Sequence, residues 1–166
     1  GTLSPFALVR EVREFFDGPI ALSGSISEGS SVLSALALGA DFAYVGTKFI
    51  ATEEANASPG YKQMIIDSTA DDIMYSATFT GVNGNYLRPS VEAAGLNPEE
   101  HTSGSKDDMN FSTSAIAKKD NSSKAWKDIW GSGQGIGTIK DAPSVQTAVD
   151  QMVSEYEEAK SRLDNF

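Results

Sequence analysis

Two short apolar segments, each ending at a glycine followed by a hydroxyl residue, constrain the fold of this chain more than any other feature. They occupy residues 20–26 and 42–47, and a helical pattern over residues 28–38 separates them. The order of strand, small-residue turn, helix, strand and small-residue turn is typical of consecutive parallel β/α units. Because parallel strands place their carboxyl ends at one edge of a sheet, we expect the two turns to be neighbours.

The residues at these turns suit a phosphate group. Gly24 removes a side chain that would block approach, and Ser25 adds a hydroxyl donor. Gly46 and Thr47 repeat the arrangement after the second strand. A helix beginning near Ser27 would add the partial positive charge of its N-terminus. The alternative is that both glycines only relieve crowding at strand ends, but their spacing on consecutive units favours phosphate binding.

A glycine-rich run over residues 131–137 is the second candidate for a binding segment. Its glycines let the backbone lie close to a flat or bulky group, and Gln134 can both donate to and accept from a polar ring edge. The run does not match the dinucleotide-binding fingerprint, since no strand leads into it and its glycine spacing differs. A flexible hinge is the alternative interpretation.

Composition excludes several classes of function. The 166 residues contain no cysteine, which removes disulfides, thiolate nucleophiles and cysteine-based metal sites. The single histidine, His101, gives neither a catalytic triad nor a metal cluster and is predicted to lie in a solvated loop. A net charge of −10 argues against nucleic-acid binding. No apolar run reaches the ~20 residues that span a bilayer.

Other residues that resemble site residues have simpler structural explanations. Glu53, Glu54 and the pair at residues 71–72 are expected on solvated faces, since the chain has 23 acidic residues. Lys48 either contacts an anion or lies at the surface where a helix starts. Trp126 and Trp130 are four residues apart and are expected to pack on one helical face.

The remaining segments complete the expected outline. Both strands are expected to be buried on both faces, as in a parallel sheet covered by helices. Ser4 and Pro5 open an amphipathic helix with an inner stripe that extends to Phe16, and Ser27 is expected to cap the helix between the strands. Further helices are expected over residues 59–68 and 89–94, a polar excursion over 97–124, and a closing helix after residue 143.

At this point the chain resembles a known family. Residues 35–54, ALALGADFAYVGTKFIATEE, are similar to the signature of the nitronate monooxygenases, also called 2-nitropropane dioxygenases. Residues 20–26 resemble the strand and glycine turn that precede that signature, and residues 133–137 resemble the family's flavin-facing segment. One departure is Ser25, where the family usually has a second glycine.

The resemblance implies a fold and a cofactor. The fold would be α/β, a partial (β/α)8 TIM barrel comprising the last two β/α units with an appended, mostly helical domain. Residues 1–52 would form the barrel units, 53–130 the appended domain, and 131–166 the glycine-rich segment and closing helix. The cofactor would be FMN, without a metal. The residues implied to bind it are Gly24, Ser25, Gly46, Thr47, Gln134 and Gly135.

The family's catalytic histidine belongs to a Gly-Gly-His-type motif upstream of the segment that matches this chain. The resemblance therefore implies a flavoprotein that acts on alkyl nitronates, present here as an inactive C-terminal fragment without a catalytic residue. The absence of cysteine fits a cytoplasmic location. Two alternatives stay open. One is a non-catalytic half-barrel that binds phosphate and pairs with a second copy, since exposed strand edges favour homo-oligomers. The other is a relative among the flavin-dependent enoyl reductases.

Overall fold

The computed structural model describes residues 2–101 and 128–165, and the described residues form two compact units. The unit that we call the parallel unit comprises residues 2–67 together with the chain from Gly135 onward. The second, called the antiparallel unit, lies within Ser68–Gln134. The parallel unit is discontinuous in sequence, with the antiparallel unit inserted into it, and it carries both of the predicted turns.

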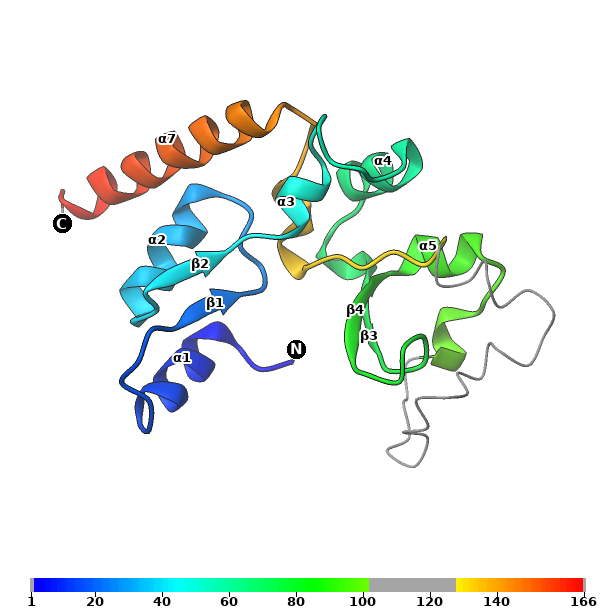
Figure 1. Cartoon of the computed structure of the whole chain (residues 1–166), viewed down its shortest axis with the longest axis horizontal. Helices are drawn as coiled ribbons and strands as arrows, with labels where there is room; N and C mark the ends of the chain where they lie inside the picture. The colour runs from blue at the N-terminus through cyan, green and yellow to red at the C-terminus, as the bar shows by residue number, and fades with distance from the viewer. Residues whose placement is uncertain (1, 102–127, 166) are drawn as a thin grey trace. The chain divides into compact units, whose positions relative to one another are not determined.

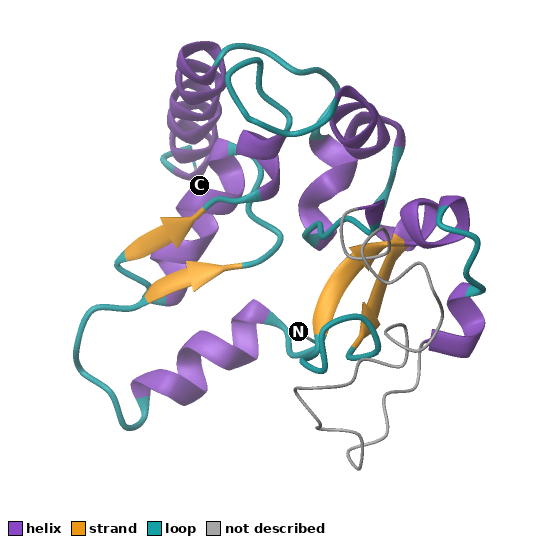
Figure 2. Ribbon diagram, turned by 45° about the vertical axis from the view of Figure 1, so that its right-hand side comes forward, coloured by secondary structure: helices purple, strands orange, loops and turns teal. Residues whose placement is uncertain are grey.

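The parallel unit is an α/β arrangement (Figure 1). Its elements are α1 (Pro5–Arg13), β1 (Ala21–Ser23), α2 (Gly29–Leu38), β2 (Phe42–Tyr44), α3 (Thr47–Ile50), α4 (Pro59–Asp67) and α7 (Val145–Leu163). The strands β1 and β2 pair in parallel, with Ala21 opposite Phe42 and Ser23 opposite Tyr44. Figure 2 shows the two arrows side by side and pointing the same way. The predicted α/β class and the parallel pairing are confirmed.

One apolar core joins the strands to their helices. Its buried side chains are contributed by α1, by β1 and the residues after it, and by α2 with its C-terminal turn: Val9, Leu22, Ile26, Ala35 and Ala40. The predicted caps of α1 and α2 are confirmed in part. Ser4 caps α1, its hydroxyl accepting from the Phe6 amide (3.3 Å), and Gly39 ends α2 with a φ of +106°. The N-cap of α2 is Glu28 and not the expected Ser27.

The expectation that both strands are buried on both faces is wrong. Leu22 is buried, but its neighbours Ala21 and Ser23 are exposed, and Phe42 and Tyr44 expose 62% and 65% of their surface. The physical reason is the period of a strand, which turns successive side chains to opposite faces. Within the described residues the parallel sheet has two strands, so the second face is left to solvent.

The amino ends of the strands are held by one arginine. Arg13 donates to the carbonyl oxygens of Gly18 (2.6 Å) and Gly39 (2.7 Å) and pairs with the Asp41 carboxylate (2.7 Å). The same carboxylate accepts from the Ile20 amide (2.8 Å). Helix α1 ends at Arg13, so the predicted continuation of the helix to Phe16 is wrong.

The antiparallel unit is built on a β-hairpin. Strand β3 (Ile73–Ser76) pairs with β4 (Gly84–Leu87), and the helix α5 (Arg88–Ala93) follows directly. Its core contains Met74, Phe79, Val91 and Ile129, and the ring of Phe79 meets that of Tyr86 edge to face at 4.8 Å. Three 3-10 helices complete the described elements: Ala70–Asp72, Pro98–His101 and Gln134–Thr138. Trp126 and residues 102–124 of the polar excursion lie outside the described residues.

Candidate functional site

The parallel pairing brings the two predicted turns to one edge. Gly24 follows Ser23 at the carboxyl end of β1, and Gly46 follows two residues after Tyr44 at the carboxyl end of β2. Both glycines are exposed, and a Cβ built on either would meet no atom within 4 Å. The backbone at both turns is therefore open to approach from solvent. Crowding is not what requires glycine at either position.

Ser25 has a backbone conformation that serine rarely adopts. Its φ of +57° is the only positive value at a non-glycine position among the described residues. For an L-residue this left-handed conformation costs roughly 1–2 kcal/mol. Gly24, just before it, has a φ of +103°, so the turn contains two consecutive residues with positive φ. Backbone strain of this kind often occurs at ligand-binding turns.

The end of the glycine-rich run packs directly against this turn. A Cβ on Gly135 would lie 2.8 Å from the carbonyl carbon and oxygen of Ser25, so the contact requires glycine at position 135. Ser27, which is buried, donates from its hydroxyl to the Gly135 carbonyl (2.6 Å) and shares a hydrogen bond with the Thr138 hydroxyl (2.8 Å). The structure thus brings Gly135 to Ser25, and it gives Ser27 a packing role that the sequence did not indicate.

Gln134 is exposed and belongs to the antiparallel unit. Its expected place beside a flavin stays a prediction. The 3-10 helix that starts at Gln134 continues to Thr138, so this part of the glycine-rich run has regular structure.

The N-terminus of α2 is already used by a side chain of the protein. The amide of Gly29 donates to the Glu155 carboxylate of α7 (2.8 Å). Gly29 also lets the two helices touch, since a Cβ there would lie 2.1 Å from the carbonyl oxygen of Met152. The first amide of α2 is therefore satisfied by a carboxylate from α7, and the expected contribution of this helix end to an anion site stays a prediction.

Lys48 fits neither of the two interpretations that the sequence left open. Its side chain is only 3% exposed, and its ammonium donates to Oε1 of Gln151 on α7 (3.3 Å). It is thus neither a surface lysine nor directed at an open anion site. Nothing in the sequence spacing could have paired residue 48 with residue 151, because the contact depends on how α7 lies against α3.

The acidic pair after α3 is exposed as expected, but one member has a structural role. Both carboxylate oxygens of Glu54 accept from the Val145 amide at the start of α7 (2.9 and 3.0 Å). The amide of Glu53 donates to the Pro143 carbonyl (3.0 Å). Anions near a helix N-terminus are stabilising. Glu54 therefore holds the N-terminal end of α7.

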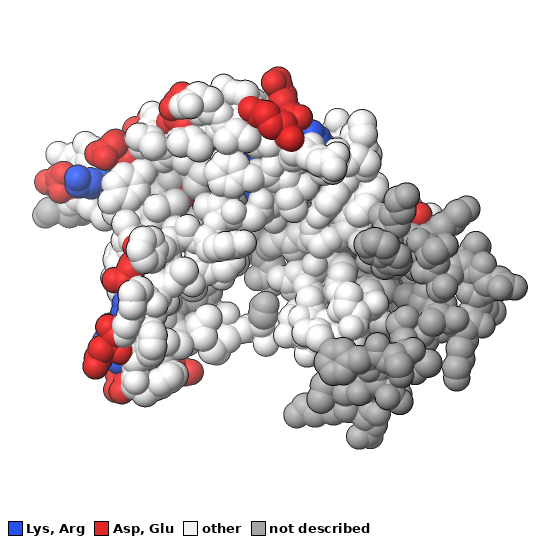
Figure 3. Space-filling view, in the orientation of Figure 1, with Lys and Arg blue, Asp and Glu red and all other residues white. Residues whose placement is uncertain are grey.

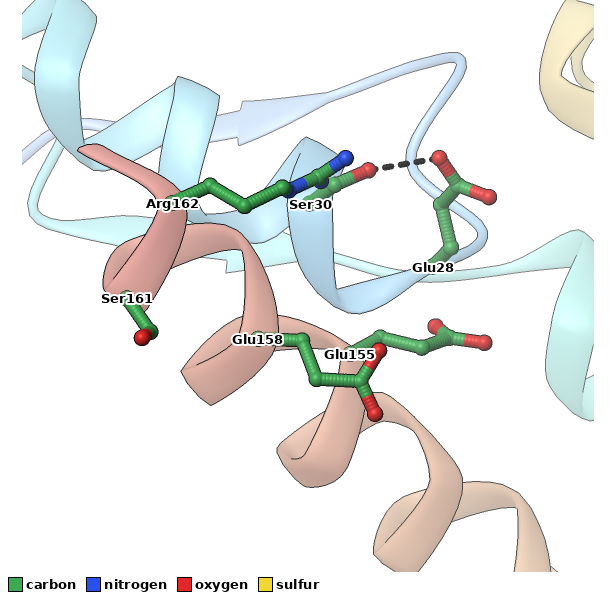
Figure 4. Close-up of a pocket in the computed structure, with 6 residues that line it drawn as sticks. All are labelled: Glu28, Ser30, Glu155, Glu158, Ser161 and Arg162. Atoms are coloured by element: carbon green, nitrogen blue, oxygen red, sulfur yellow. Dashed lines mark hydrogen bonds between the residues drawn. The ribbon is translucent and has the colours of Figure 1, made fainter. Parts of the chain in front are cut away.

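A hollow of about 520 Å³ lies between the N-terminus of α2 and the later turns of α7. Figure 4 shows its lining, in which Ser30 donates to Glu28. The lining residues are Glu28, Ser30, Glu155, Glu158, Ser161 and Arg162. Three carboxylates against one guanidinium disfavour an anionic ligand, and none of the predicted cofactor-binding residues takes part. Among the described residues, no group of three acidic or histidine side chains is arranged to hold a metal ion.

Acidic side chains are unevenly spread over the face of the parallel unit that Figure 3 shows. In the view of Figure 3, acidic side chains gather over α1 and α7, whereas the surface over β2 shows none. An anion at the carboxyl ends of the strands is therefore not opposed by a carboxylate on that face, despite the net charge of −10.

Comparison with known proteins identifies the family. The family model described as nitronate monooxygenase matches residues 1–155. The chain belongs to the nitronate monooxygenase family. A nitronate monooxygenase of Paraburkholderia phytofirmans is 31% identical over 96 residues, which cover 58% of this chain and 26% of the relative. The resemblance noted from residues 20–54 is thereby confirmed, and the family is one of oxidoreductases.

Two solved structures share the fold of this chain. The nitroalkane oxidase from Streptomyces ansochromogenes aligns with a TM-score of 0.71 at 23% identity, covering 97% of this chain and 46% of that one. FabK from Thermotoga maritima aligns with a TM-score of 0.69 at 21% identity, covering 99% and 52%. The chain spans about half the length of these proteins. Within the described residues, no helix has the length and apolar character needed to cross a bilayer.

Proposed function

We propose that this nitronate monooxygenase family chain binds FMN, and that the turns at Gly24-Ser25 and Gly46-Thr47 hold its phosphate. The observation that carries the proposal is their placement: two open glycine turns at the carboxyl ends of neighbouring parallel strands. In β/α barrels, phosphate sites are frequently made by such loops after consecutive strands.

The residues present fit a phosphate group. Gly24 and Gly46 have no Cβ, and the space in front of their backbone is open. Phosphate oxygens can therefore approach the amides of both turns. Ser25 and Thr47 add hydroxyl groups at the same two turns. Gly135 packs against the Ser25 backbone, and Gln134, the residue before it, would face the isoalloxazine ring.

The wider assignment follows from the family. We propose a partial (β/α)8 barrel with an appended, mostly helical domain, divided at residues 1–52, 53–130 and 131–166, in a cytoplasmic, homo-oligomeric protein. When bound, the flavin supplies the redox chemistry, with an alkyl nitronate as the substrate class. The chain's own residues hold the phosphate and orient the ring. We assign no catalytic base to this chain.

The test compares two ligands that differ only in the phosphate. The purified chain is titrated with FMN and with riboflavin, and quenching of flavin fluorescence gives both dissociation constants. We expect FMN to bind at least about tenfold more tightly, which corresponds to about 1.4 kcal/mol. Equal affinity for the two ligands, or no binding of either, would contradict the phosphate site.

Gly46→Ala provides the matched variant. The added methyl meets no protein atom within 4 Å, so the fold should be unaffected, but it occupies the space through which phosphate oxygens approach. We expect FMN affinity to fall about tenfold while riboflavin affinity and the unfolding midpoint stay at wild-type values. Unchanged FMN affinity in this variant would remove Gly46 from the site.

The exposed aromatic side chains of β2 favour one alternative, a non-catalytic half-barrel that pairs with a second copy. Phe42 and Tyr44 are exposed aromatic residues on an edge strand, which is typical of interaction surfaces. A colourless preparation that sedimented as a dimer and ignored added FMN would favour this alternative. The enoyl reductase alternative makes the same FMN prediction and differs in the reaction and in its substrate class.

A further inference from the structure

Helix α7 is hydrogen-bonded to α2 and to α3, the helices that follow the two candidate phosphate turns. Lys48 lies one residue after Thr47, and its buried ammonium donates to Oε1 of Gln151 on α7 (3.3 Å). The contact connects the second turn to α7 through a side chain that is shielded from solvent. It accounts for the burial of a lysine at a position where sequence alone allowed a surface residue.

The same glutamine continues the connection toward the first turn. Nε2 of Gln151 donates to Oε1 of Glu155 (2.9 Å), and the other carboxylate oxygen of Glu155 accepts from the Gly29 amide (2.8 Å). Gly29 lies four residues after Ser25, at the start of α2. Lys48, Gln151, Glu155 and Gly29 therefore form a continuous chain of hydrogen bonds, which we call the α7 relay.

The chemistry of the relay depends on an amide at its centre. A glutamine side chain presents an acceptor to a cation and a donor to a carboxylate at the same time. A glutamate at this position would repel Glu155, and an apolar residue would leave the buried ammonium without this acceptor. Hydrogen bonds in which one partner is charged are stronger than neutral ones, so both contacts of the amide are favourable.

Resting on the proposed function, we propose that Gln151 is a positioning residue for the FMN phosphate. The strand ladder that joins the two turns directly is only three residue pairs long. The α7 relay adds a second link, from the residue after Thr47 to the residue that starts α2, and so fixes the spacing between the two turns. A phosphate held by both turns requires that spacing, whereas a ligand without a phosphate does not.

The experiment replaces the amide and keeps the side-chain length. Gln151→Met removes both hydrogen bonds. Gln146→Met is the matched control, because Gln146, like Gln151, is an exposed residue of α7 that donates to an acid four residues later, Asp150 (2.9 Å). Both variants are titrated with FMN and riboflavin and unfolded with urea. We expect Gln151→Met to weaken FMN about threefold to tenfold and to leave riboflavin unchanged, with Gln146→Met equal to wild type.

A second variant keeps the test decisive if the buried ammonium destabilises Gln151→Met. Lys48→Met combined with Gln151→Met removes that charge, and we expect it to restore the unfolding midpoint while FMN affinity stays low. A purely structural role would instead return FMN affinity with stability. Wild type without a preference for FMN over riboflavin refutes the phosphate site itself. A preference retained in full by Gln151→Met, in a wild type that has it, refutes only the positioning role.

Discussion

Ser25, whose backbone adopts the left-handed conformation, lies in the first turn. Two substitutions at this position can separate the effect on folding stability from the effect on FMN binding. Ser25→Gly removes both the Cβ and the hydroxyl, whereas Ser25→Ala removes only the hydroxyl. At a φ of +57°, the Cβ costs roughly 1–2 kcal/mol in the folded state. Relief of this strain by glycine is partly offset, by about 0.4–1 kcal/mol, because glycine raises the conformational entropy of the unfolded chain. We therefore expect Ser25→Gly to be more stable than wild type by about 0.5–1 kcal/mol.

Binding should respond differently. Ser25 is exposed, and loss of a hydroxyl that donates to phosphate costs about 1 kcal/mol, or about fivefold in the FMN dissociation constant. We expect this loss in both variants, while Ser25→Ala keeps wild-type stability. Urea unfolding and FMN titration on the same preparations measure the two effects. The strain argument is refuted if Ser25→Gly unfolds at a lower urea concentration than wild type, and the hydroxyl argument if Ser25→Ala binds FMN as wild type does.

Two further predictions concern the scaffold. The hydrogen bond from the Ile20 amide and, secondarily, Arg13 lower the pKa of Asp41 below its ordinary value of about 3.9. The carboxylate therefore stabilises the fold at pH values above about 3.9, and this contribution is lost as the pH falls through the lowered pKa. Asp41→Asn should therefore lower the urea midpoint at pH 7 and flatten its decline below pH ~4; an equal midpoint at pH 7 would contradict the role of the carboxylate. Glu54→Ala should lower stability by about 1 kcal/mol, because the Val145 amide loses its acceptor. The adjacent Glu53→Ala is its control, and an equal loss in both would mean that charge alone, rather than the contact, is responsible.

The sequence predicted those parts of the fold that depend on local order. Ser4 before Pro5 gives the start of α1, Gly39 gives the end of α2, and two apolar runs ending in glycine give the parallel strands. Each of these residues influences the backbone only within a few positions of itself in the sequence. Family resemblance added the cofactor hypothesis, since a glycine turn by itself does not specify a ligand.

The missed features depend on contacts between residues far apart in sequence. Glu155 reaches Gly29 across 126 positions and Gln151 reaches Lys48 across 103, so no periodicity or motif records either contact. Ser27 is a further case of a long-range contact that the sequence did not predict. Its position suggested a helix cap, but its hydroxyl is hydrogen-bonded to the Gly135 carbonyl and the Thr138 hydroxyl. The exposure of Phe42 and Tyr44 was missed because apolar character predicts burial and does not reveal which face has a partner.

The insertion of the antiparallel unit into the parallel unit has a consequence for biosynthesis. When the ribosome has made β1, α2 and β2, the helix that contacts Gly29 and Lys48 is still more than a hundred residues from being complete. Closing contacts over such a separation costs loop entropy and slows folding. The contacts of α7 with Gly29 and Lys48 therefore form only after the whole antiparallel unit has been synthesised, and until then α2 and α3 lack this packing partner.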